Sequence, residues 1–379
     1  MSHFTVLVIG QDPEKQLAPY HEFECTGEVD QYVQSIDQLQ EAREEYASST
    51  ERRFKAPDGE MHDPYDARFY RDMTEEEAKV VGPIAGTGFG RGLSWHSRDW
   101  GDGRGYRAKI HFLPDGWEDV QLNTTDAQTF PQFIESWYGR PQLKDGEQPD
   151  LRDTHKWGWY RVDDEGNVTE LVDRTNPNKK WDWYVLGGRW TGFFKMKEGA
   201  RGIQGRPGIL TSPSRQGHAD AAFKMDIDFD TMRAEAEAEA ATKFDAVRSI
   251  IEPHLPVTPW RELLDQYRGE QPAKAGGIDA AREAYGAQPA VQALRESDQR
   301  WCNAEDFAGD RADYIRKAGI ASCMTFAIVK DGKWYECGSM GWWGAVTDEK
   351  DSDTWTEEFG KLVAELPDDT LLSVYDCHI

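Results

Sequence analysis

The sequence has few of the features that cross-link a chain or hold it in a membrane. Its five cysteines show no C-x-x-C spacing, so the sequence predicts neither a disulfide framework nor a zinc ribbon. No stretch approaches the roughly 18 consecutive apolar residues that a membrane span needs. The apolar run near the N-terminus is too short for a secretory signal and lacks a basic lead-in and a cleavage site. These absences favour reduced thiols, a cytoplasmic protein and no membrane partner.

Positive charge is also scarce. The 69 acidic and 44 basic residues give a formal net charge of −25, which excludes a protein that coats bulk DNA. Aromatic residues are abundant, with 15 Trp, 14 Tyr and 16 Phe, so a hydrophobic core can form without disulfide bonds. We expect a globular chain of two or three domain-sized units, or of one domain that carries large insertions.

Strand patterns mark both ends of the chain. Residues 2–10 and 322–332 each place β-branched residues in a short apolar run, and Asp331-Gly332 is a strong hairpin signal. A capping box at Thr354 and Glu357 begins an amphipathic helix that ends before Pro367. Residues 370–379 form another strand pattern. The C-terminal part is therefore predicted as strand, hairpin, helix and strand.

The N-terminal half has similar signals, with a short helix pattern at 130–138 and an alternating strand pattern at 181–190. We predict an α+β fold with a ferredoxin-like antiparallel sheet, in the order β-α-β, insertion, β-α-β. The last strand would then run antiparallel beside the first. The expected domains are 1–200, the N-terminal half of the core with insertions; 201–320, a mostly helical insertion; and 321–379, the C-terminal half of the core.

The charge is unevenly distributed along the chain. Residues 89–112, the first basic segment, hold five bases and two acids, a net +3; residues 179–224, the second basic segment, hold nine and three, a net +6. Both are rich in glycine and aromatic residues, which favours local binding of a phosphate by Arg side chains and glycine amides, with Trp as a stacking surface. The predicted phosphate ligands are Arg91, Arg98, Arg189 and Arg206, and the stacking residues are Trp190 and Trp342. The alternative is turns that carry solvated Lys and Arg.

Two further groups of residues could carry chemistry. Asp226 and Asp228 alternate along the chain, as carboxylates that gather Mg²⁺ or Mn²⁺ do, although Asp228 or Asp230 could instead cap the helix that begins near Thr231.

At the chain ends, adjacent first and last strands would bring His3 close to His378, with Asp376 and His378 on one face of the sheet and Cys377 on the other. Histidine, cysteine and carboxylate suit either a transition metal or an acid–base pair, and His3, His378 and Asp376 are the predicted catalytic residues. The alternative is a polar sheet edge satisfied by hydrogen bonds.

Five strings in the sequence are unusual together: the start MSHFTVLVIG, QLAPYHEFECTG at 16–27, LGGRWTGFF at 186–194, DIDF at 226–229 and the ending DCHI. In these strings the chain resembles a family of uncharacterised proteins encoded by tailed phages and prophages. The resemblance spans both ends and the middle of the chain and brings no activity or functional residue with it. It implies a phage-encoded, non-structural accessory protein that acts in the cytoplasm of a host bacterium.

Two functions fit these observations. The first is a phosphate-handling protein, a binding protein or a hydrolase or transferase, whose partner is an anionic small molecule such as a nucleotide, or a nucleic-acid end. The second is a non-catalytic acidic inhibitor of a host bacterial protein, for example in counter-defence, that presents its acids as a mimic of nucleic-acid phosphates.

Overall fold

The chain folds into two compact units. The computed structural model describes residues 3–22, 31–77, 87–90, 93–99, 106–144, 146–207, 215–268, 277–340, 346–347, 350 and 352–379. Unit 1 comprises Met1–Glu24 and Asn176–Ile379, and unit 2 comprises Cys25–Thr175. The expected domain boundaries at residues 200 and 320 both fall inside unit 1.

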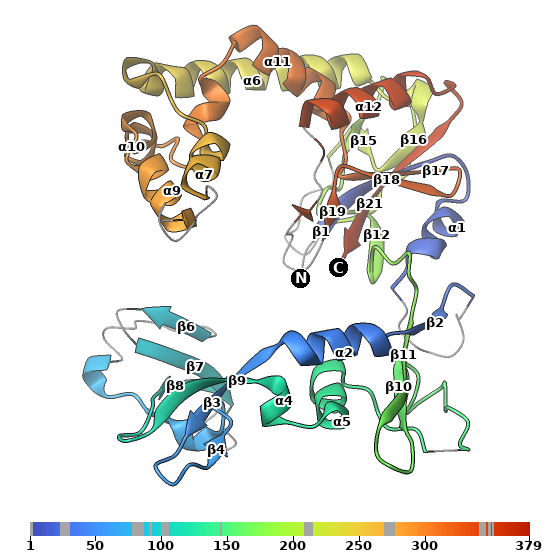
Figure 1. The fold of residues 1–379 in the computed structure, drawn as a ribbon. Helices are drawn as coiled ribbons and strands as arrows, with labels where there is room; N and C mark the ends of the chain where they lie inside the picture. The colour runs from blue at the N-terminus through green and yellow to red at the C-terminus, as the bar shows by residue number, and fades with distance from the viewer. Residues whose placement is uncertain are drawn as a thin grey trace. The chain divides into compact units, whose positions relative to one another are not determined.

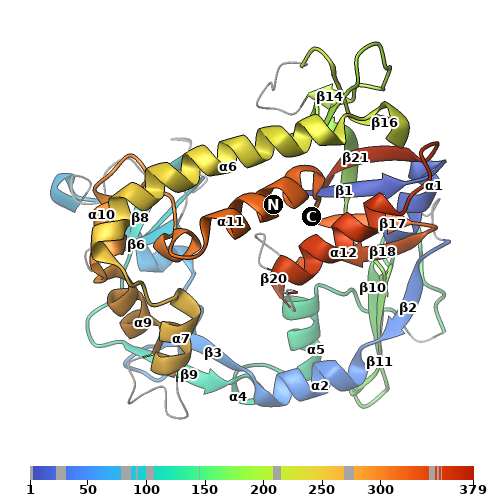
Figure 2. The same ribbon diagram turned by 90° about the horizontal axis from the view of Figure 1, so that it is seen from above.

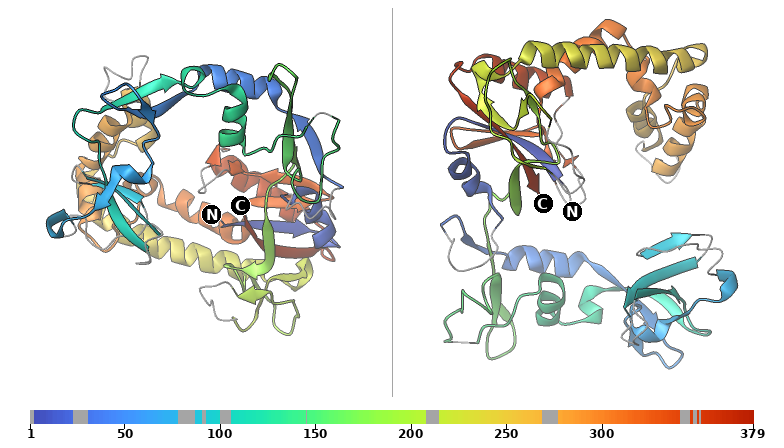
Figure 3. Two further views of the ribbon diagram at one scale, coloured as in Figure 1. Left: turned by 90° about the horizontal axis from the view of Figure 1, so that it is seen from below. Right: turned by 180° about the vertical axis from the view of Figure 1, so that it is seen from behind.

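Unit 1 is built on a seven-stranded sheet that contains both chain ends (Figure 1). Along the sheet the strands are β14 (Arg206–Pro207), β12 (Trp183–Gly188), β21 (Leu371–His378), β1 (His3–Ile9), β17 (Ala327–Lys330) and β18 (Lys333–Glu336), and β16 (Ala221–Phe223) also pairs with β21. The first strand lies antiparallel beside the last, as predicted, and Figure 3 shows the two side by side in dark blue and dark red.

Alternation along β1 explains how one strand serves two cores. Phe4, Val6 and Val8 pack on one face of the sheet with Leu17 and Tyr375, while Leu7 and Ile9 pack on the other. Helix α12 (Ser352–Ala364) covers the second face through its own apolar stripe, which includes Trp355, Phe359 and Val363. Burying an apolar side chain of this size stabilises the fold by roughly 1.5–3 kcal/mol.

The rest of unit 1 is mostly helical between residues 229 and 323. Its helices are α6 (Phe229–Ile251), η5 (Glu252–His254), α7 (Trp260–Arg268), α9 (Gly277–Gly286), α10 (Pro289–Arg295), η6 (Ala304–Phe307), α11 (Arg311–Ile320) and η7 (Ala321–Cys323). Helix α11 runs along α6 (Figure 2). Phe244, Val247 and Ile251 of α6 form a core of their own with α10 and η6, as the periodicity of the helix predicts.

Unit 1 also has these short helices and strands among its described residues: α1 (Pro13–Leu17), η1 (Ala18–Tyr20), β13 (Phe194–Lys195), β15 (His218–Ala219), η4 (Lys224–Asp226), β19 (Ser339–Met340) and β20 (Val346–Thr347). Within the described residues, none of the helices combines the length and the apolar character needed to cross a bilayer.

The described residues of unit 2 form three small antiparallel sheets. The first holds β10 (Gly158–Val162), β11 (Val168–Thr175) and β2 (Gln34–Asp37); the second holds β4 (Met61–His62), β3 (Thr50–Lys55) and β9 (Glu118–Asn123); the third holds β5 (Tyr70–Asp72), β8 (Tyr106–His111), β7 (Leu93–Asp99) and β6 (Thr87–Gly90). The helices that the structure describes in full in unit 2 are α2 (Leu39–Ser48), η2 (Ala67–Phe69), α4 (Thr124–Ala127), α5 (Phe130–Phe133) and η3 (Ile134–Tyr138).

The fold is mixed α+β, as predicted, but the sheet of unit 1 differs from an antiparallel ferredoxin-like sheet. Strands β1 and β17 are parallel, with Val6 beside Ala327, and β12 is parallel to β14. The predicted helix at 130–138 forms as α5 and η3, but it belongs to unit 2 and therefore does not link β1 to β12 within the sheet. A strand pattern specifies which residues face the core but not the direction of the neighbouring strand, which explains the difference.

Candidate functional site

Strand register brings the predicted histidines together at one end of the unit 1 sheet. In the β1–β21 pair His3 lies opposite His378, and in the β12–β21 pair Trp183 also lies opposite His378. Because side chains alternate along β21, Asp376 and His378 share a face, and Cys377 packs with the core on the opposite face. Three strands thus place His3, His378, Asp376 and Trp183 around one point.

His3 is held by a buried carboxylate. Its Nδ1 lies 2.7 Å from Oδ1 of Asp376, which is 2% exposed. The other oxygen of Asp376 accepts the backbone N–H of Arg189 at 2.9 Å. Gly188 has a φ of +54°, and a Cβ at this position would lie 2.3 Å from Cβ of Asp376, so only glycine allows the chain to approach this closely. The glycine-rich turn after β12 therefore seals Asp376 from solvent.

His378 has a carboxylate of its own. Its Nδ1 lies 2.8 Å and 3.0 Å from the two oxygens of Asp182. Its ring stacks on Trp183, with centroids 5.0 Å apart and planes at 14°, and stands edge-on to His3, with centroids 4.9 Å apart. These contacts fix the plane of the imidazole, and the site consists of two adjacent histidine–carboxylate pairs.

The hydrogen bonds determine which nitrogen of each ring is available. An ionised carboxylate only accepts hydrogen bonds, so each Nδ1 donates its hydrogen and Nε2 is left with the lone pair in the neutral ring. Within the part of the chain that the structure describes, Nε2 of His3 and of His378 has no hydrogen-bond partner. A neutral ring of this tautomer can take a proton at Nε2, and a protonated ring can give one.

The glycine-rich part of the second basic segment is arranged around an internal carboxylate. Asp220 is fully buried and accepts the backbone N–H groups of Gly192 at 2.6 Å, Phe193 at 3.2 Å and Gly205 at 2.7 Å, together with the hydroxyl of Thr191 at 2.9 Å. These amides are therefore not directed at an external phosphate. Sequence analysis identified the glycine amides as an anion site, and the anion that they bind is Asp220 itself.

The predicted phosphate ligands of this segment remain on the surface. Arg189 follows β12 directly, Arg206 lies beside Gly187 in the parallel β12–β14 pair, and both are exposed. Trp190 is half-buried, and its backbone N–H closes a turn onto the carbonyl of Gly187. The backbone N–H of Arg189 donates a hydrogen bond to Asp376, which also holds His3. Arg189, a predicted phosphate ligand, therefore adjoins the histidine pair.

Three of the predicted phosphate-binding and stacking residues have no described side chain. Arg91 and Trp342 lie outside the described residues, and Arg98 belongs to β7 of unit 2, where only the backbone is described. The placement of the first basic segment therefore remains a prediction.

Asp226 and Asp228 do not join the histidines. Asp228 is the N-cap of α6, where its carboxylate accepts the backbone N–H of Thr231 at 3.0 Å and the hydroxyl of the same residue at 2.7 Å. Both aspartates follow β16, which pairs with the Leu371 end of β21, whereas His378 lies at the opposite end, about 24 Å away for an eight-residue strand. Asp228 therefore caps the helix, as the alternative to metal binding in the sequence analysis expected.

No described group of three or more His, Cys, Asp or Glu side chains could hold a metal ion. The expected site for Mg²⁺ or Mn²⁺ at Asp226 and Asp228 therefore has no third His, Cys, Asp or Glu ligand among the described residues.

Sequence reasoning missed Asp182, Trp183 and Asp220 as parts of a site. Asp182 lies 196 positions before His378, and only the β12–β21 register brings them together. Asp220 has no neighbouring motif that would distinguish it from a solvated acid. Comparison of the chain with protein-family models, with curated proteins and with solved structures returned no match.

Proposed function

We propose that this chain is a phosphate-handling enzyme, a hydrolase or transferase that acts on a nucleotide or a nucleic-acid end, with His3 and His378 as its acid–base pair. One observation carries the proposal: two imidazoles 4.9 Å apart, each oriented by a carboxylate through Nδ1, adjoin the exposed, arginine-bearing turn after β12. Both rings are largely shielded from solvent, with the side chain of His3 9% exposed and that of His378 7% exposed. Titratable groups that are held in fixed orientations at one point are typical of catalytic sites.

The geometry supports one imidazole as the general base and the other as the general acid. Nε2 of one neutral ring takes a proton from the attacking water or hydroxyl as the new P–O bond forms. Nε2 of the other, protonated ring gives its proton to the leaving oxygen as the old P–O bond breaks. Asp376 and Asp182 are positioning residues that hold the tautomer and stabilise the imidazolium. Arg189 and Arg206 would bind the phosphoryl oxygens, since a guanidinium matches their geometry with two parallel hydrogen bonds.

The test is turnover by His3→Gln and His378→Gln variants on a panel of nucleoside phosphates and of oligonucleotides with 3′ or 5′ phosphates, with and without added Mg²⁺ or Mn²⁺. Each variant should lose about 10²–10⁴-fold in kcat/KM, which is the usual contribution of one general acid or base. The wild-type pH profile should be bell-shaped, and each variant should lose one limb of it. Asp182→Asn should lower kcat with little change in KM.

His254→Gln is the matched control, because His254 is exposed in η5 and belongs to the helical part of unit 1. Its activity should equal that of the wild type, and circular dichroism should show that all variants remain folded. Absence of turnover on the whole panel, or full activity in both histidine variants, would refute the proposal. That result would favour the acidic inhibitor of a host protein, which needs neither imidazole.

A further inference from the structure

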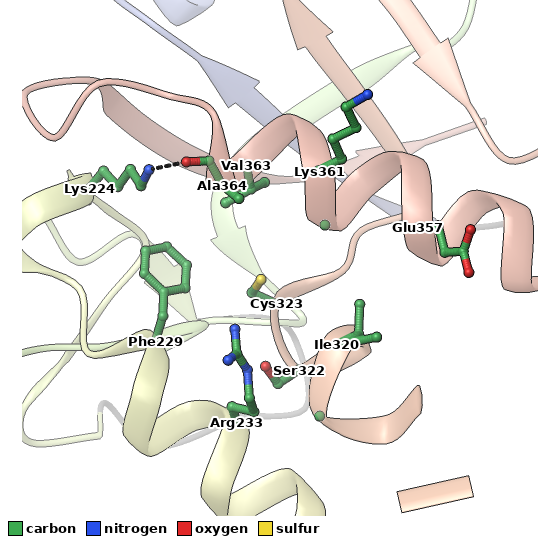
Figure 4. A pocket seen from close by; sticks show the side chains of 12 residues that line it. Lys224, Phe229, Arg233, Ile320, Ser322, Cys323, Glu357, Lys361, Val363 and Ala364 are labelled. Atoms are coloured by element: carbon green, nitrogen blue, oxygen red, sulfur yellow. Dashed lines mark hydrogen bonds between the residues drawn. The ribbon is translucent and has the colours of Figure 1, made fainter. Parts of the chain in front are cut away.

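A pocket lies in unit 1 between α6, the junction of α11 and η7, and α12 (Figure 4). Its volume is about 510 Å³, within the range of pockets that hold small organic molecules. The elements that form it contribute no residue to the histidine pair. Its lining residues are Lys224, Phe229, Arg233, Gly319, Ile320, Ser322, Cys323, Glu357, Gly360, Lys361, Val363 and Ala364.

The walls of this pocket are mainly apolar. Phe229 comes from the first turn of α6, Ile320 from the end of α11 and Val363 from α12. Burial raises the pKa of the Cys323 thiol to about 11, so at neutral pH Cys323 carries no charge and acts as a small apolar side chain. Such walls favour a ligand with a hydrophobic body.

The charged groups around the pocket are not equivalent. Lys224 is already engaged, because its Nζ donates to the carbonyls of Ala364 at 2.9 Å and Leu366 at 2.6 Å at the end of α12. Arg233 and Lys361 have no ion pair with any described residue. Figure 4 shows the Arg233 side chain directed toward Ser322 and Cys323, and its positive charge acts on the Cys323 thiol.

Glu357 is the acid among the lining residues, and it lies on α12 across from Arg233 (Figure 4). The pocket therefore has one engaged cation, two cations without an ion partner and a single acid. An anionic group on the ligand would form an ion pair with Arg233. The planar guanidinium of an arginine binds a carboxylate through two parallel hydrogen bonds.

We propose that this pocket binds an amphipathic small molecule that has an apolar body and one carboxylate, with Arg233 as the ligand of the carboxylate. The apolar body lies against Phe229, Ile320 and Val363. The proposal is independent of the acid–base pair, and a failure of either leaves the other standing.

The test uses three probes with the same ten-carbon chain: decanoate, decanol and decylamine. Isothermal titration calorimetry on the full-length protein should show binding of decanoate, with decanol about tenfold weaker or more and decylamine weaker still. The Arg233→Gln variant should weaken decanoate about tenfold and leave decanol unchanged. Arg268→Gln is the matched control, because Arg268 is an exposed arginine of α7 away from the pocket, and it should bind decanoate as the wild type does.

A second variant tests the cavity itself. Gly360 lines the pocket, and a Cβ there would lie 3.2 Å from Cγ2 of Ile320, so Gly360→Leu extends a side chain between α12 and α11. This variant should weaken decanoate and decanol alike. Equal binding of decanoate and decanol, tighter binding of decylamine, no binding of any probe, or an Arg233→Gln variant that binds decanoate normally would each overturn the proposal.

Discussion

Asp220 shows how a single buried charge can organise a loop. A carboxylate without solvent is stable only when hydrogen bonds replace the lost water, and Asp220 has four of them from Thr191, Gly192, Phe193 and Gly205. Gly187 adds to the requirement, because a Cβ at this position, where φ is +78°, would lie 2.5 Å from Oδ2 of Asp220. Gly187 is therefore explained by close packing against an internal acid, as Gly188 is by its approach to Asp376.

We predict that Asp220→Asn destabilises unit 1 by about 3 kcal/mol or more. The substitution turns one acceptor into an NH₂ group that faces backbone N–H donors, which leaves buried donors without acceptors. Urea unfolding followed by circular dichroism measures the effect. Asp298→Asn, at an exposed position, should change the free energy of unfolding by less than about 0.5 kcal/mol. A loss of less than about 1 kcal/mol in Asp220→Asn would contradict this account.

Asp376 and Asp182 differ from Asp220 because each also orients an imidazole. The alternation of β21 was sufficient to predict that Asp376 and His378 share a face and that Cys377 does not, because this follows from the period of a strand. The partners of these residues could not be predicted, since Asp182 and Arg189 reach them only through the register between β12 and β21. Register depends on the turns and the packing of the whole sheet.

At the scale of elements, local signals predicted several helices and strands correctly, but none of the strands of unit 2. Hairpin β17–β18 and helix α12 form where turn residues and a capping box predict them, and helix α6 begins beside Thr231, as predicted, within the insertion expected to be mostly helical. The relations between elements were less predictable. The parallel pairing of β1 with β17 and the separation of α5 from the sheet depend on contacts between residues far apart in sequence.

The cap of α6 gives a prediction about pH. Hydrogen bonds from the hydroxyl and backbone N–H of Thr231 lower the pKa of Asp228 below its ordinary value. A lowered folded-state pKa means that the carboxylate stabilises the fold above its unfolded pKa of about 3.9, and that this contribution is lost as pH falls through the folded-state pKa. The difference in urea midpoint between wild type and Asp228→Ala should therefore be largest near pH 6 and shrink toward pH 3.

Asp298→Ala, which removes an exposed acid without a cap role, should show no comparable trend when its urea midpoint is measured over the same pH range. A difference between wild type and Asp228→Ala that stays constant from pH 6 to pH 3 would show that the ionised cap contributes nothing to α6.

At the scale of the whole molecule, the two units are joined where the chain leaves and re-enters unit 1. Asn176 donates through Nδ2 to the carbonyls of Pro19 at 2.8 Å and His21 at 2.9 Å, and the ring of His21 stacks on Trp181, with centroids 4.5 Å apart. Unit 1 therefore holds Asn176 beside the chain at residues 19–21 through hydrogen bonds of its own. None of the strands described between residues 31 and 175 belongs to the seven-stranded sheet.

We predict that replacing residues 25–175 by a Gly-Ser linker of about six residues leaves unit 1 folded, because His21 and Asn176 are hydrogen-bonded neighbours and a short loop between them has a small closure entropy. Such a variant should unfold in one cooperative transition and keep the NMR signals of the His3 and His378 rings. If the variant instead shows no cooperative transition, unit 1 depends on contacts with unit 2, and the acid–base pair must be studied in the full chain alone. If it folds, turnover by the shortened chain on the same substrate panel shows whether the second basic segment binds phosphate without the first.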